Sequence, residues 1–472
     1  MISTGLRHFH LRCILWDHTV NMPLSYRLVV YFGIVVIAIS CNKTVGSGSP
    51  GTPNDSTTSA PLNITITSIN PTNGPFKTID TITGSGLDKI PTPDSVLING
   101  HKITIIRDSA DQVIVEIPLL VGTGNVDIWY KGKMYPGPVF TYDSVLYVTT
   151  IAGTTDPGDV NGKGADARFY SPLGIAVDHT GNIYVAEEFG NVIRKIDTAA
   201  NVTILAGSPS QQRGYVDGIG AGAMFSSPYG LCLGPDGYLY VGEEYNYRVR
   251  KVSTSGLVTT FAGATWDGNP NDGFRDGNAD SATFNSPFGV ASDASGNIYV
   301  ADLYNNKIRK ITSAGIVSTL AGGDYYHYGQ QDGKGASALF YTPRCVAVDP
   351  SGNVFVIDGY NQLLRKITPD GTVSTLLGPY APSLSGIYEL FNSTAVATDK
   401  QGNVFFTYDG GLAIAEMKPD GTLVRYAVTG AAGYTDGPIP LATFGVITGM
   451  VVDDSGTIYL ADQNRVRKVA WQ

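Results

Sequence analysis

A unit of 51 to 59 residues recurs six times in the second half of the chain. It reads Phe-x-[Ser/Thr]-Pro, Gly-x-x-x-Asp, Gly-Asn-[Ile/Val]-[Tyr/Phe]-Val, Arg-Lys-[Ile/Val] and Val-[Ser/Thr]-Thr-x-Ala-Gly, in that order. The sixth copy ends at Gln472 after its third β-rich run, and the missing fourth run stands ahead of the first copy, at 148–153. A chain that supplies the end of its last repeat from its beginning is predicted to close into a ring. The copies open at Phe169, Phe225, Phe284, Phe340, Phe391 and Phe444.

Four short β-rich runs in each copy favour a propeller over a solenoid. In the third copy the runs are 289–293, 297–301, 307–311 and 317–321, and Gly, Asn and Ser residues typical of turns separate them. Each copy is therefore predicted to form a four-stranded antiparallel blade, and six blades would surround a central channel. The run at 148–153 would be the outermost strand of the last blade, which removes an open sheet edge.

The repeat resembles the NHL-repeat family of β-propellers. The residues that carry the resemblance in the third copy are Ser286, Pro287, Asp293 and the runs 296–302 and 306–311. The resemblance covers about residues 146–472 and implies a six-bladed NHL-type propeller. Some propellers of this kind bind RNA through a basic face, and others are lyases that use histidines around the channel.

Two copies depart from the pattern. In the fifth copy, Ser393 and Thr394 replace Ser-Pro, and Ala415 and Glu416 replace Arg-Lys. The sixth copy has lost only the Ser-Pro pair, and its acid and arginine remain. The fifth copy is therefore the one where we expect asymmetry in the ring.

A different β pattern occupies residues 63–143. Its short runs, with landmarks Pro-x-x-Gly, Gly-x-Gly and Ile-Asn-Gly, resemble the IPT/TIG domain, which implies an immunoglobulin-like sandwich of six or seven strands. The whole chain is thus predicted to be all-β, with this sandwich ahead of the propeller. We expect a spacer role for the domain; a contribution to carbohydrate or protein binding is the alternative.

The N-terminus predicts export and a lipid anchor. An apolar run at 28–39 is short for a membrane span and follows Arg27, as in a signal peptide, which we assign to residues 1–40. The following Ser-Cys resembles a bacterial lipobox with Cys41 as the lipidated residue, while a transmembrane anchor or an ordinary cleaved signal are the alternatives. Met22 is a plausible true start, and residues 41–62 read as a flexible linker. We therefore expect a lipoprotein of the bacterial cell envelope, attached to the outer membrane on its surface or periplasmic side.

Composition and cysteine use exclude several classes of function. The net charge of -9 and the even spread of Lys and Arg argue against nucleic acid as a partner. Cys232 and Cys345 fall in the first strands of blades that are not neighbours, too far apart for a disulfide, so we expect free thiols. They belong to no metal-binding motif, and we expect neither a metal nor another cofactor.

Acids and arginines recur in register through the repeats. An acid follows the second strand of a blade, and an arginine stands in the third strand, so we expect structural ion pairs within blades. The fifth copy has Tyr408 and Ala415 in these positions, with Asp409 one place later as an alternative acid. The Asp-Gly pairs before each opening aromatic read as turns, with calcium binding as a weaker alternative. The expected pairs are Glu187–Arg194, Glu243–Arg250, Asp302–Arg309, Asp358–Arg365 and Asp462–Arg467.

One end of the propeller is predicted to gather acids and aromatic residues. Antiparallel strands place the loop after the second strand and the loop between blades on the same side, and both kinds of loop are rich in Tyr. Such a face suits a glycan or a protein partner, while tyrosines that only fill blade ends are the alternative. The candidate ligand-binding residues are Trp266, Tyr245, Tyr304, Tyr325, Tyr326 and Tyr360.

Catalysis at the channel is the competing hypothesis. A lyase or hydrolase of this fold would need a cluster of histidines, but the propeller has only His179 and His327, on opposite faces. No nucleophile and base stand out, so we assign no catalytic residue. We expect a non-catalytic binding or scaffold module; a lyase or hydrolase, or a purely structural assembly module, are the alternatives.

Replacing Cys41 with Ser tests the lipid anchor. We expect the Cys41→Ser chain to move from the membrane fraction to the soluble fraction, because the thiol that carries the lipid is gone. Immunoblots of fractionated cells measure this, with the unchanged chain as the control that stays with the membrane. A Cys41→Ser chain that remains in the membrane fraction shows that the lipobox interpretation is wrong.

Overall fold

The computed structural model describes residues 62–74, 78–90, 93–108, 112–117, 123–143, 145–264, 273–323, 327–378, 390, 392–426, 432–439 and 441–471. The predicted signal peptide, Met22, Cys41 and the linker up to residue 61 lie outside these ranges. Within them, no helix has the length and apolar character needed to cross a membrane.

The first domain is a set of eight strands around one apolar core. Strand β5 changes partners along its length: His101 to Ile103 pair with β4, and Thr104 to Asp108 pair with β6. This switch joins two groups of strands, in the order β1-β3-β6-β5-β4-β7-β8-β2. The eight are β1 (Thr65–Asn70), β2 (Asn73–Gly74), β3 (Ile79–Ser85), β4 (Ser95–Ile98), β5 (His101–Asp108), β6 (Gln112–Glu116), β7 (Gly124–Tyr130) and β8 (Lys133–Tyr142).

Alternating burial explains these strands. In β7, Val126, Ile128 and Tyr130 point inward, and the residues between them are more exposed. The sequence predicted six or seven strands, whereas the structure has eight. The additional strands are the two-residue β2 and β5, whose apolar and polar residues alternate weakly because it pairs with two groups of strands.

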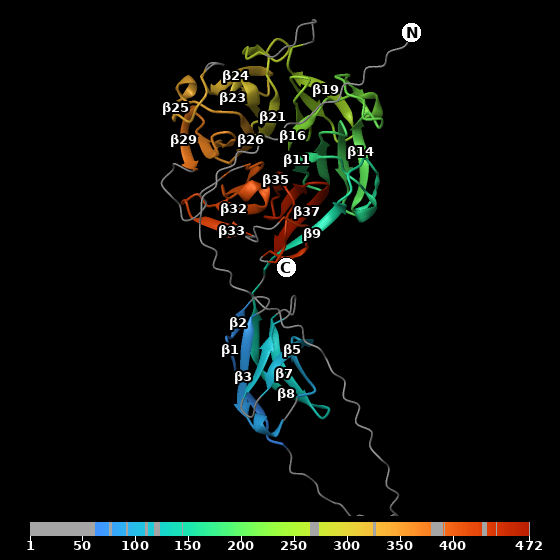
Figure 1. Cartoon of the computed structure of the whole chain (residues 1–472), viewed down its shortest axis with the longest axis vertical. Helices are drawn as coiled ribbons and strands as arrows, with labels where there is room; N and C mark the ends of the chain where they lie inside the picture. Colours follow the sequence, from blue (N-terminus) through green and yellow to red (C-terminus); the bar gives the residue numbers. More distant parts are fainter. Residues whose placement is uncertain are drawn as a thin grey trace, which may run out of the picture. The chain divides into compact units, whose positions relative to one another are not determined.

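The second domain is a ring of six blades, which confirms the predicted propeller (Figure 1). Strands β11, β16, β21, β26, β30 and β35 are the first in their blades and surround the axis. Blades 1 to 3 comprise β11 (Pro172–Val177), β12 (Ile183–Glu187), β13 (Val192–Ile196) and β14 (Asn201–Gly207); β16 (Pro228–Leu233), β17 (Leu239–Glu243), β18 (Arg248–Val252) and β19 (Leu257–Ala262); and β21 (Pro287–Ser292), β22 (Ile298–Asp302), β23 (Lys307–Ile311) and β24 (Ile316–Ala321).

Blades 4 to 6 complete the ring. They comprise β26 (Pro343–Val348), β27 (Val354–Asp358), β28 (Leu363–Ile367) and β29 (Thr372–Leu377); β30 (Val396–Thr398), β31 (Val404–Tyr408), β32 (Ala413–Met417) and β33 (Leu423–Tyr426); and β35 (Ile447–Val452), β36 (Ile458–Asp462), β37 (Arg465–Trp471) and β9 (Leu146–Gly153).

Strand β9 closes the circle. It pairs antiparallel with β37 over its whole length, with Val148 opposite Val469, and the two lie side by side in Figure 1. The first strand of the domain thus completes the last blade, as the truncated sixth repeat predicted, and both open edges of the ring disappear.

Among the described residues, five blades carry a short fifth strand that the sequence did not predict. Each begins at the Gly of an Asp-Gly pair, or of Asn161-Gly162 in blade 1, and adds to the outer edge of its blade; Gly162, for example, lies opposite Val202. Two residues are too few for an alternating pattern, so nothing in the sequence indicated strands there. They are β10 (Gly162–Lys163), β15 (Gly218–Ile219), β20 (Gly277–Asn278), β25 (Gly333–Lys334) and β34 (Gly437–Pro438).

The opening aromatic residue of each repeat packs between consecutive blades. Phe225 is fully buried in a cluster that joins Tyr184 and Ile193 of blade 1 to Val241 of blade 2. The same position is buried at Phe169, Phe284, Phe340 and Phe444, whereas Phe391 lies outside the described residues. Each blade therefore shares its core with its neighbour, as a closed ring requires.

Small residues line the waist of the channel, where the first strands approach one another most closely. A Cβ added to Gly449 would fall on the carbonyl oxygen of Leu173 in the next blade, well inside van der Waals contact. Glycine is therefore required there for space. The ring of small residues consists of Gly174, Gly230, Gly289, Cys345, Ala395 and Gly449.

A Gly449→Ala substitution is expected to destabilise the propeller. The added methyl group must push β35 away from β11, and such overpacking costs roughly 1–3 kcal/mol. Thermal unfolding measures the loss, with Gly222→Ala as the matched control, because a Cβ at Gly222 meets nothing within 4 Å. Equal melting temperatures for the two variants would show that the waist is not closely packed.

Candidate functional site

The ring has two chemically different ends. At one end the first strands begin and the loops between second and third strands lie; we call this the aromatic end. At the other, the first strands finish in tight turns such as that of Asp178; we call this the turn end. Because neighbouring strands of a blade are antiparallel, every blade contributes the same kinds of loop to the same end.

Four consecutive blades place an exposed aromatic side chain at the same position of the repeat, two residues after the second-strand acid. These side chains are 45% exposed at Phe189, 51% at Tyr245, 52% at Tyr304 and 66% at Tyr360. We call this set the aromatic arc. Blades 5 and 6 have Gly410 and Asn464 at this position, so the arc covers blades 1 to 4 only.

Other aromatic rings and backbone bonds support the arc. Tyr341 stacks on Tyr360 with a centroid distance of 4.7 Å, and Tyr328 stacks on Tyr341 at 4.4 Å. Tyr170 meets Phe189 edge to face at 5.4 Å. Phe189 and Tyr360, the two end members of the arc, thus pack against further rings.

Charged side chains lie beside the arc in blades 1 and 2. Glu188 and Glu244 are half-buried and accept hydrogen bonds from the hydroxyls of Ser171, at 3.1 Å, and Ser227, at 3.3 Å. Burial raises the pKa of both carboxyls, and the charge of Glu188 adds to the rise at Glu244, so the two lie close together. Arg213 lies over the ring of Tyr245 at 5.6 Å.

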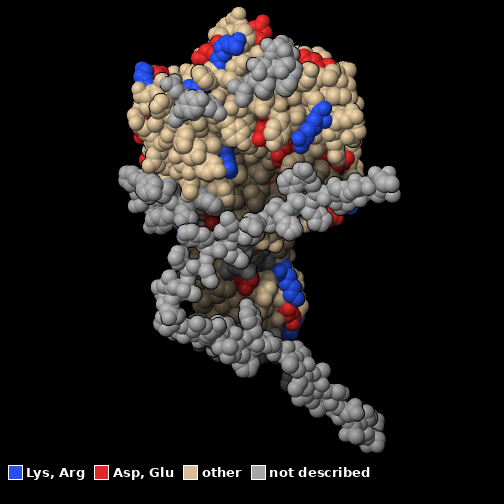
Figure 2. Space-filling view, turned by 45° about the horizontal axis from the view of Figure 1, so that its top comes forward, with Lys and Arg blue, Asp and Glu red and all other residues tan. Residues whose placement is uncertain are grey.

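Charged side chains are sparse on the face of the propeller seen in Figure 2. In that view, acidic and basic side chains are scattered over a surface that is mostly uncharged. The absence of nucleic acid among the partners stays a prediction from the composition.

Beneath the aromatic end, a buried arginine joins two loops in each of five blades. In blade 3, Arg309 donates to Asp302 at 2.7 Å and to Asp276 of the preceding Asp-Gly loop at 2.7 Å. Asp276 also accepts from the backbone N–H and hydroxyl of Thr319 in β24. We call this arrangement the arginine clasp. Its acid, arginine and second acceptor are Glu187, Arg194 and Asn161; Glu243, Arg250 and Asp217; Asp302, Arg309 and Asp276; Asp358, Arg365 and Asp332; and Asp462, Arg467 and Asp436.

The clasps belong to the scaffold. The first acid and the arginine of each are fully buried, out of reach of a ligand. Burial raises the pKa of Asp358 to about 6, although Arg365 acts in the opposite direction. The Asp-Gly aspartates were interpreted from sequence as turn residues, and the structure adds this second role.

Blade 5 replaces the clasp as a whole. Tyr408 and Ala415 occupy the acid and arginine positions and are buried in an apolar cluster with Leu390. The hydroxyl of Thr407 accepts hydrogen bonds from the backbone N–H groups of Thr394 and Ala395, just before β30. Losing both charges together avoids leaving one of them buried without a partner.

Blade 1 has a clasp with an extra carboxylate. In blade 3, the amide of Asn305 donates to Asp302 at 2.8 Å, and Asn246 and Asn361 do the same in blades 2 and 4. Blade 1 has Gly190 at this position. A Cβ at Gly190 would lie 2.6 Å from Asp159 Oδ1 and 2.7 Å from Glu187 Oε2, so a second carboxylate fills the space of the missing amide.

The contact with Asp159 affects the pKa of Glu187. Burial raises the pKa of Glu187 well above its usual value, Asp159 raises it further, and Arg194 opposes the rise. Asp159 Oδ1 is buried without a hydrogen-bond partner, and its other oxygen accepts from Gln211. The nearby Asp159 carboxylate therefore favours the protonated form of Glu187.

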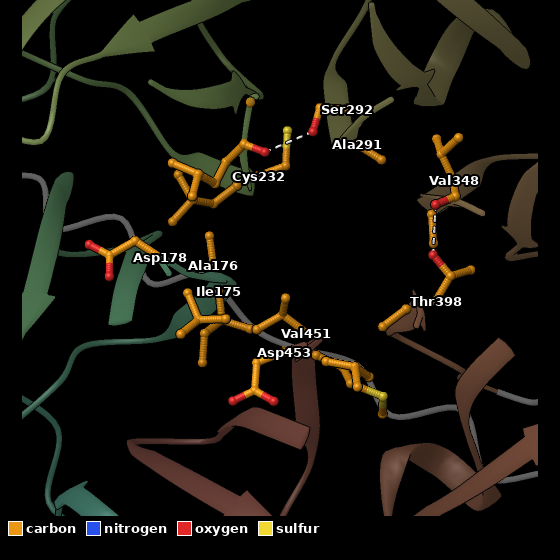
Figure 3. Close-up of a pocket in the computed structure, with 18 of the residues that line it drawn as sticks. Ile175, Ala176, Asp178, Cys232, Ala291, Ser292, Val348, Thr398, Val451 and Asp453 are labelled. Carbon is orange, nitrogen blue, oxygen red and sulfur yellow. Dashed lines mark hydrogen bonds between the residues drawn. The ribbon is translucent and has the colours of Figure 1, made fainter. Parts of the chain in front are cut away.

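A cavity with a volume of about 840 Å³ opens at the turn end (Figure 3). Its wall is largely aliphatic, with Ile175, Ala176, Ala291 and Val451 among its residues. At the waist the free volume narrows to about 60 Å³, so the cavity does not continue as a wide passage to the aromatic end.

Polar groups on the wall of this cavity are engaged within the fold. Ser292 donates to the carbonyl of Leu233, and Thr398 to that of Val348 (Figure 3). The carboxylates of Asp178 and Asp453 point away from the centre of the cavity, and Asp178 accepts four hydrogen bonds from Thr180 and Asn182 of its own turn and a fifth from Tyr184. None of these four side chains is a free base or nucleophile.

The cysteines and histidines add no reactive site in the described ranges. Cys232 and Cys345 are free, as expected, and burial raises the pKa of both thiols to about 12. His179 lines the turn-end cavity, while His327 belongs to a loop between blades 3 and 4. No group of three or more His, Cys, Asp or Glu side chains suited to a metal ion is found in the part of the chain that the structure describes.

Half of the six predicted ligand-binding residues fall on the arc. Tyr245, Tyr304 and Tyr360 belong to it, while Trp266, Tyr325 and Tyr326 lie outside the described residues. Sequence reasoning did not select Phe189, Glu188, Glu244 or Asp159. The first three share repeat positions that an alignment of the six copies would have singled out; Asp159 has no such signal, because its role depends on the missing side chain of Gly190.

Two family models match the chain. The IPT/TIG domain matches residues 65–142, and the NHL repeat matches residues 284–311. The chain is an NHL-repeat β-propeller protein with an IPT/TIG domain. Both resemblances stated from the sequence are thereby confirmed.

Curated relatives share the propeller region. The human NHL repeat-containing protein 2 is 32% identical over 320 residues, which cover 61% of this chain and 41% of that protein. Protein SUPPRESSOR OF QUENCHING 1 of Arabidopsis thaliana is 24% identical over 331 residues, 67% of this chain and 26% of that protein. The NHL-repeat protein described here thus spans well under two thirds of the length of either relative.

Solved structures share the fold at low identity. An auxiliary nutrient binding protein from Bacteroides thetaiotaomicron is 16% identical, with 86% of this chain and 97% of that chain covered and a TM-score of 0.45. A virginiamycin B lyase from Staphylococcus aureus is 15% identical, with 70% and 99% covered and a TM-score of 0.42. At these scores the likeness carries no argument about function.

An Asp159→Asn substitution tests the carboxyl pair of blade 1. A raised folded pKa means that the native state holds the Glu187 proton more tightly than the unfolded chain, so wild-type stability falls as the pH rises above the unfolded value of 4.5. The new amide can donate to Glu187 as Asn305 donates to Asp302. We expect the variant to melt at a higher temperature than the wild type at pH 8, with a smaller difference at pH 5.

The matched control for this test is Asp166→Asn, an exposed aspartate near the same blade edge, which should shift melting equally at both pH values. An Asp159→Asn chain that melts below the wild type at pH 8 would contradict the stated effect of Asp159 on the pKa of Glu187.

Proposed function

We propose that this NHL-repeat protein is a lipid-anchored, non-catalytic binding module of the bacterial cell envelope, and that the aromatic end of its propeller holds the ligand. The observation that carries the proposal is the aromatic arc, four exposed rings at one repeat position in four consecutive blades. Exposed aromatic side chains at a shared position are typical of a recognition surface, because they provide large contact areas with few rotatable bonds.

The arrangement of the rest of the propeller favours binding over turnover. The arginine clasps hold the loops beneath the arc in place, so the rings are positioned without an induced rearrangement. The turn-end cavity, where a lyase or hydrolase would work, has aliphatic walls and acids and hydroxyls that are engaged in the fold. We therefore place binding ahead of catalysis at the channel.

The anchor and the first domain complete the proposal. Cys41 would carry the lipid, the linker to residue 62 would give reach, and the IPT/TIG domain would act as a spacer between the membrane and the propeller. The protein would then contact the membrane through its lipid alone, and the propeller would bind the ligand or partner protein.

Retention of the soluble chain on cell envelopes tests the binding role. The Cys41→Ser chain, which lacks the anchor, is incubated with washed envelopes, and the bound fraction is measured. We expect Tyr304→Ala and Tyr360→Ala, each added to this chain, to reduce retention severalfold, because each removes an exposed ring from the arc.

The matched control is Trp471→Ala, since Trp471 is 62% exposed but lies in β37, outside the arc. Equal retention of arc and control variants sinks the proposal, provided that all variants keep the wild-type melting temperature. Treating the envelopes with periodate or with protease before incubation then shows whether a glycan or a protein is bound.

A further inference from the structure

We propose that the aromatic arc binds a neutral, extended polysaccharide that lies along blades 1 to 4. This inference rests on the proposed binding role of the aromatic end and names the class of its ligand.

Regular placement of the arc points to a repeating ligand. Phe189, Tyr245, Tyr304 and Tyr360 occupy the same position in successive blades, so each stands one blade further round the ring than the last. A polymer of similar units can place one sugar face on each ring in turn. The CH-rich face of a pyranose suits an aromatic ring, and the tyrosine hydroxyls offer hydrogen bonds to sugar hydroxyls.

Charged groups within the arc favour sugar over protein. Glu188 and Glu244 lie next in sequence to Phe189 and Tyr245, and their negative charges, together with Tyr304, raise the pKa of Tyr245, which places them all in one neighbourhood. The cores of protein–protein interfaces are depleted of charged residues and are contiguous apolar patches. Exposed rings with a carboxylate beside two of them instead match a ligand that offers both CH faces and hydroxyl donors.

The sign of these charges favours a neutral polymer. The half-buried carboxylates of Glu188 and Glu244 share one basic neighbour, Arg213, which lowers the pKa of both. The chain as a whole carries a net charge of -9. A polyanion such as a uronic-acid polymer would meet repulsion from both carboxylates. Neutral sugar hydroxyls can donate to the same carboxylates without that cost.

The gap in the arc favours an extended shape. Gly410 of blade 5 and Asn464 of blade 6 present no ring, so the platforms form an open arc rather than a closed circle. A compact ligand centred on the axis would gain from contacts on all six sides. A chain that passes over four blades needs only these four, and each added contact raises the effective concentration for the next.

Affinity gel electrophoresis of the Cys41→Ser chain tests the ligand class. The neutral probes are pullulan, mixed-linkage β-glucan, xylan, galactomannan and inulin, and polygalacturonate is the anionic probe. We expect retardation by at least one neutral polymer and none by polygalacturonate. With oligosaccharides of that polymer in calorimetry, affinity should rise steeply with chain length until the arc is spanned.

Single substitutions locate the site. Tyr245→Ala, Tyr304→Ala and Tyr360→Ala should each lower affinity for the retarding polymer roughly 5- to 20-fold, and the double variants should lose more. Tyr304→Phe keeps the ring and should lose no more than about threefold. Trp471→Ala is the exposed aromatic control and should bind like the parent chain.

Each contrary outcome has a distinct meaning. No retardation by any neutral polymer overturns the polysaccharide inference, and so does retardation by polygalacturonate alone. Equal affinity for a monosaccharide and a long oligosaccharide overturns the extended shape. If envelope retention still depends on the arc but is abolished by protease and not by periodate, the ligand is a protein, and the proposed binding role stands without this inference.

Discussion

The arginine clasp is the interaction on which the propeller's loops depend. In five blades a fully buried guanidinium bridges the acid that ends the second strand and an acceptor on the loop before the first strand. It also lies over the ring of the opening phenylalanine, at 5.0 to 5.3 Å from the centroid. Burying five ion pairs is costly, and the Nε atom of each arginine has no hydrogen-bond partner, so the gain is a fixed geometry more than stability.

The two blades that depart from the clasp show what it requires. Blade 5 has lost the acid and the arginine together and has Tyr408 and Ala415 in their places, so neither charge of the pair is buried without the other. Blade 1 keeps both but has lost the asparagine that donates to the acid, and Asp159 has taken its place. Blade 5 therefore lacks both charges of the clasp. Blade 1 has one carboxylate more, that of Asp159, which raises the pKa of Glu187.

A rigid scaffold of this kind leaves function to positions that the repeat does not constrain. The clasp acids recur because they hold loops, whereas the residues one and two places later vary, and these are Glu188, Phe189, Glu244 and Tyr245 in blades 1 and 2. The aromatic arc stands on loops that the clasps of blades 1 to 4 keep in place, and further rings pack against Phe189 and Tyr360. The turn end, by contrast, is a cavity whose acids Asp178 and Asp453 are turned away from its centre. The two ends therefore share one scaffold but differ in the chemistry that they offer.

Much of the fold was determined by the sequence itself. The truncated sixth repeat predicted the closure by β9, because the period and order of β-rich runs are local properties that survive without coordinates. The same register predicted which acid and which arginine of each blade are candidates for pairing, and it placed Tyr245, Tyr304 and Tyr360 at one end. Only the tertiary structure decided that the Asp-Gly aspartates complete the clasps, that Gly449 is needed for space at the waist, and that Asp159 meets Glu187. Those contacts join residues that lie 28 to 286 positions apart in the chain or depend on a side chain that is missing, and no local pattern encodes either.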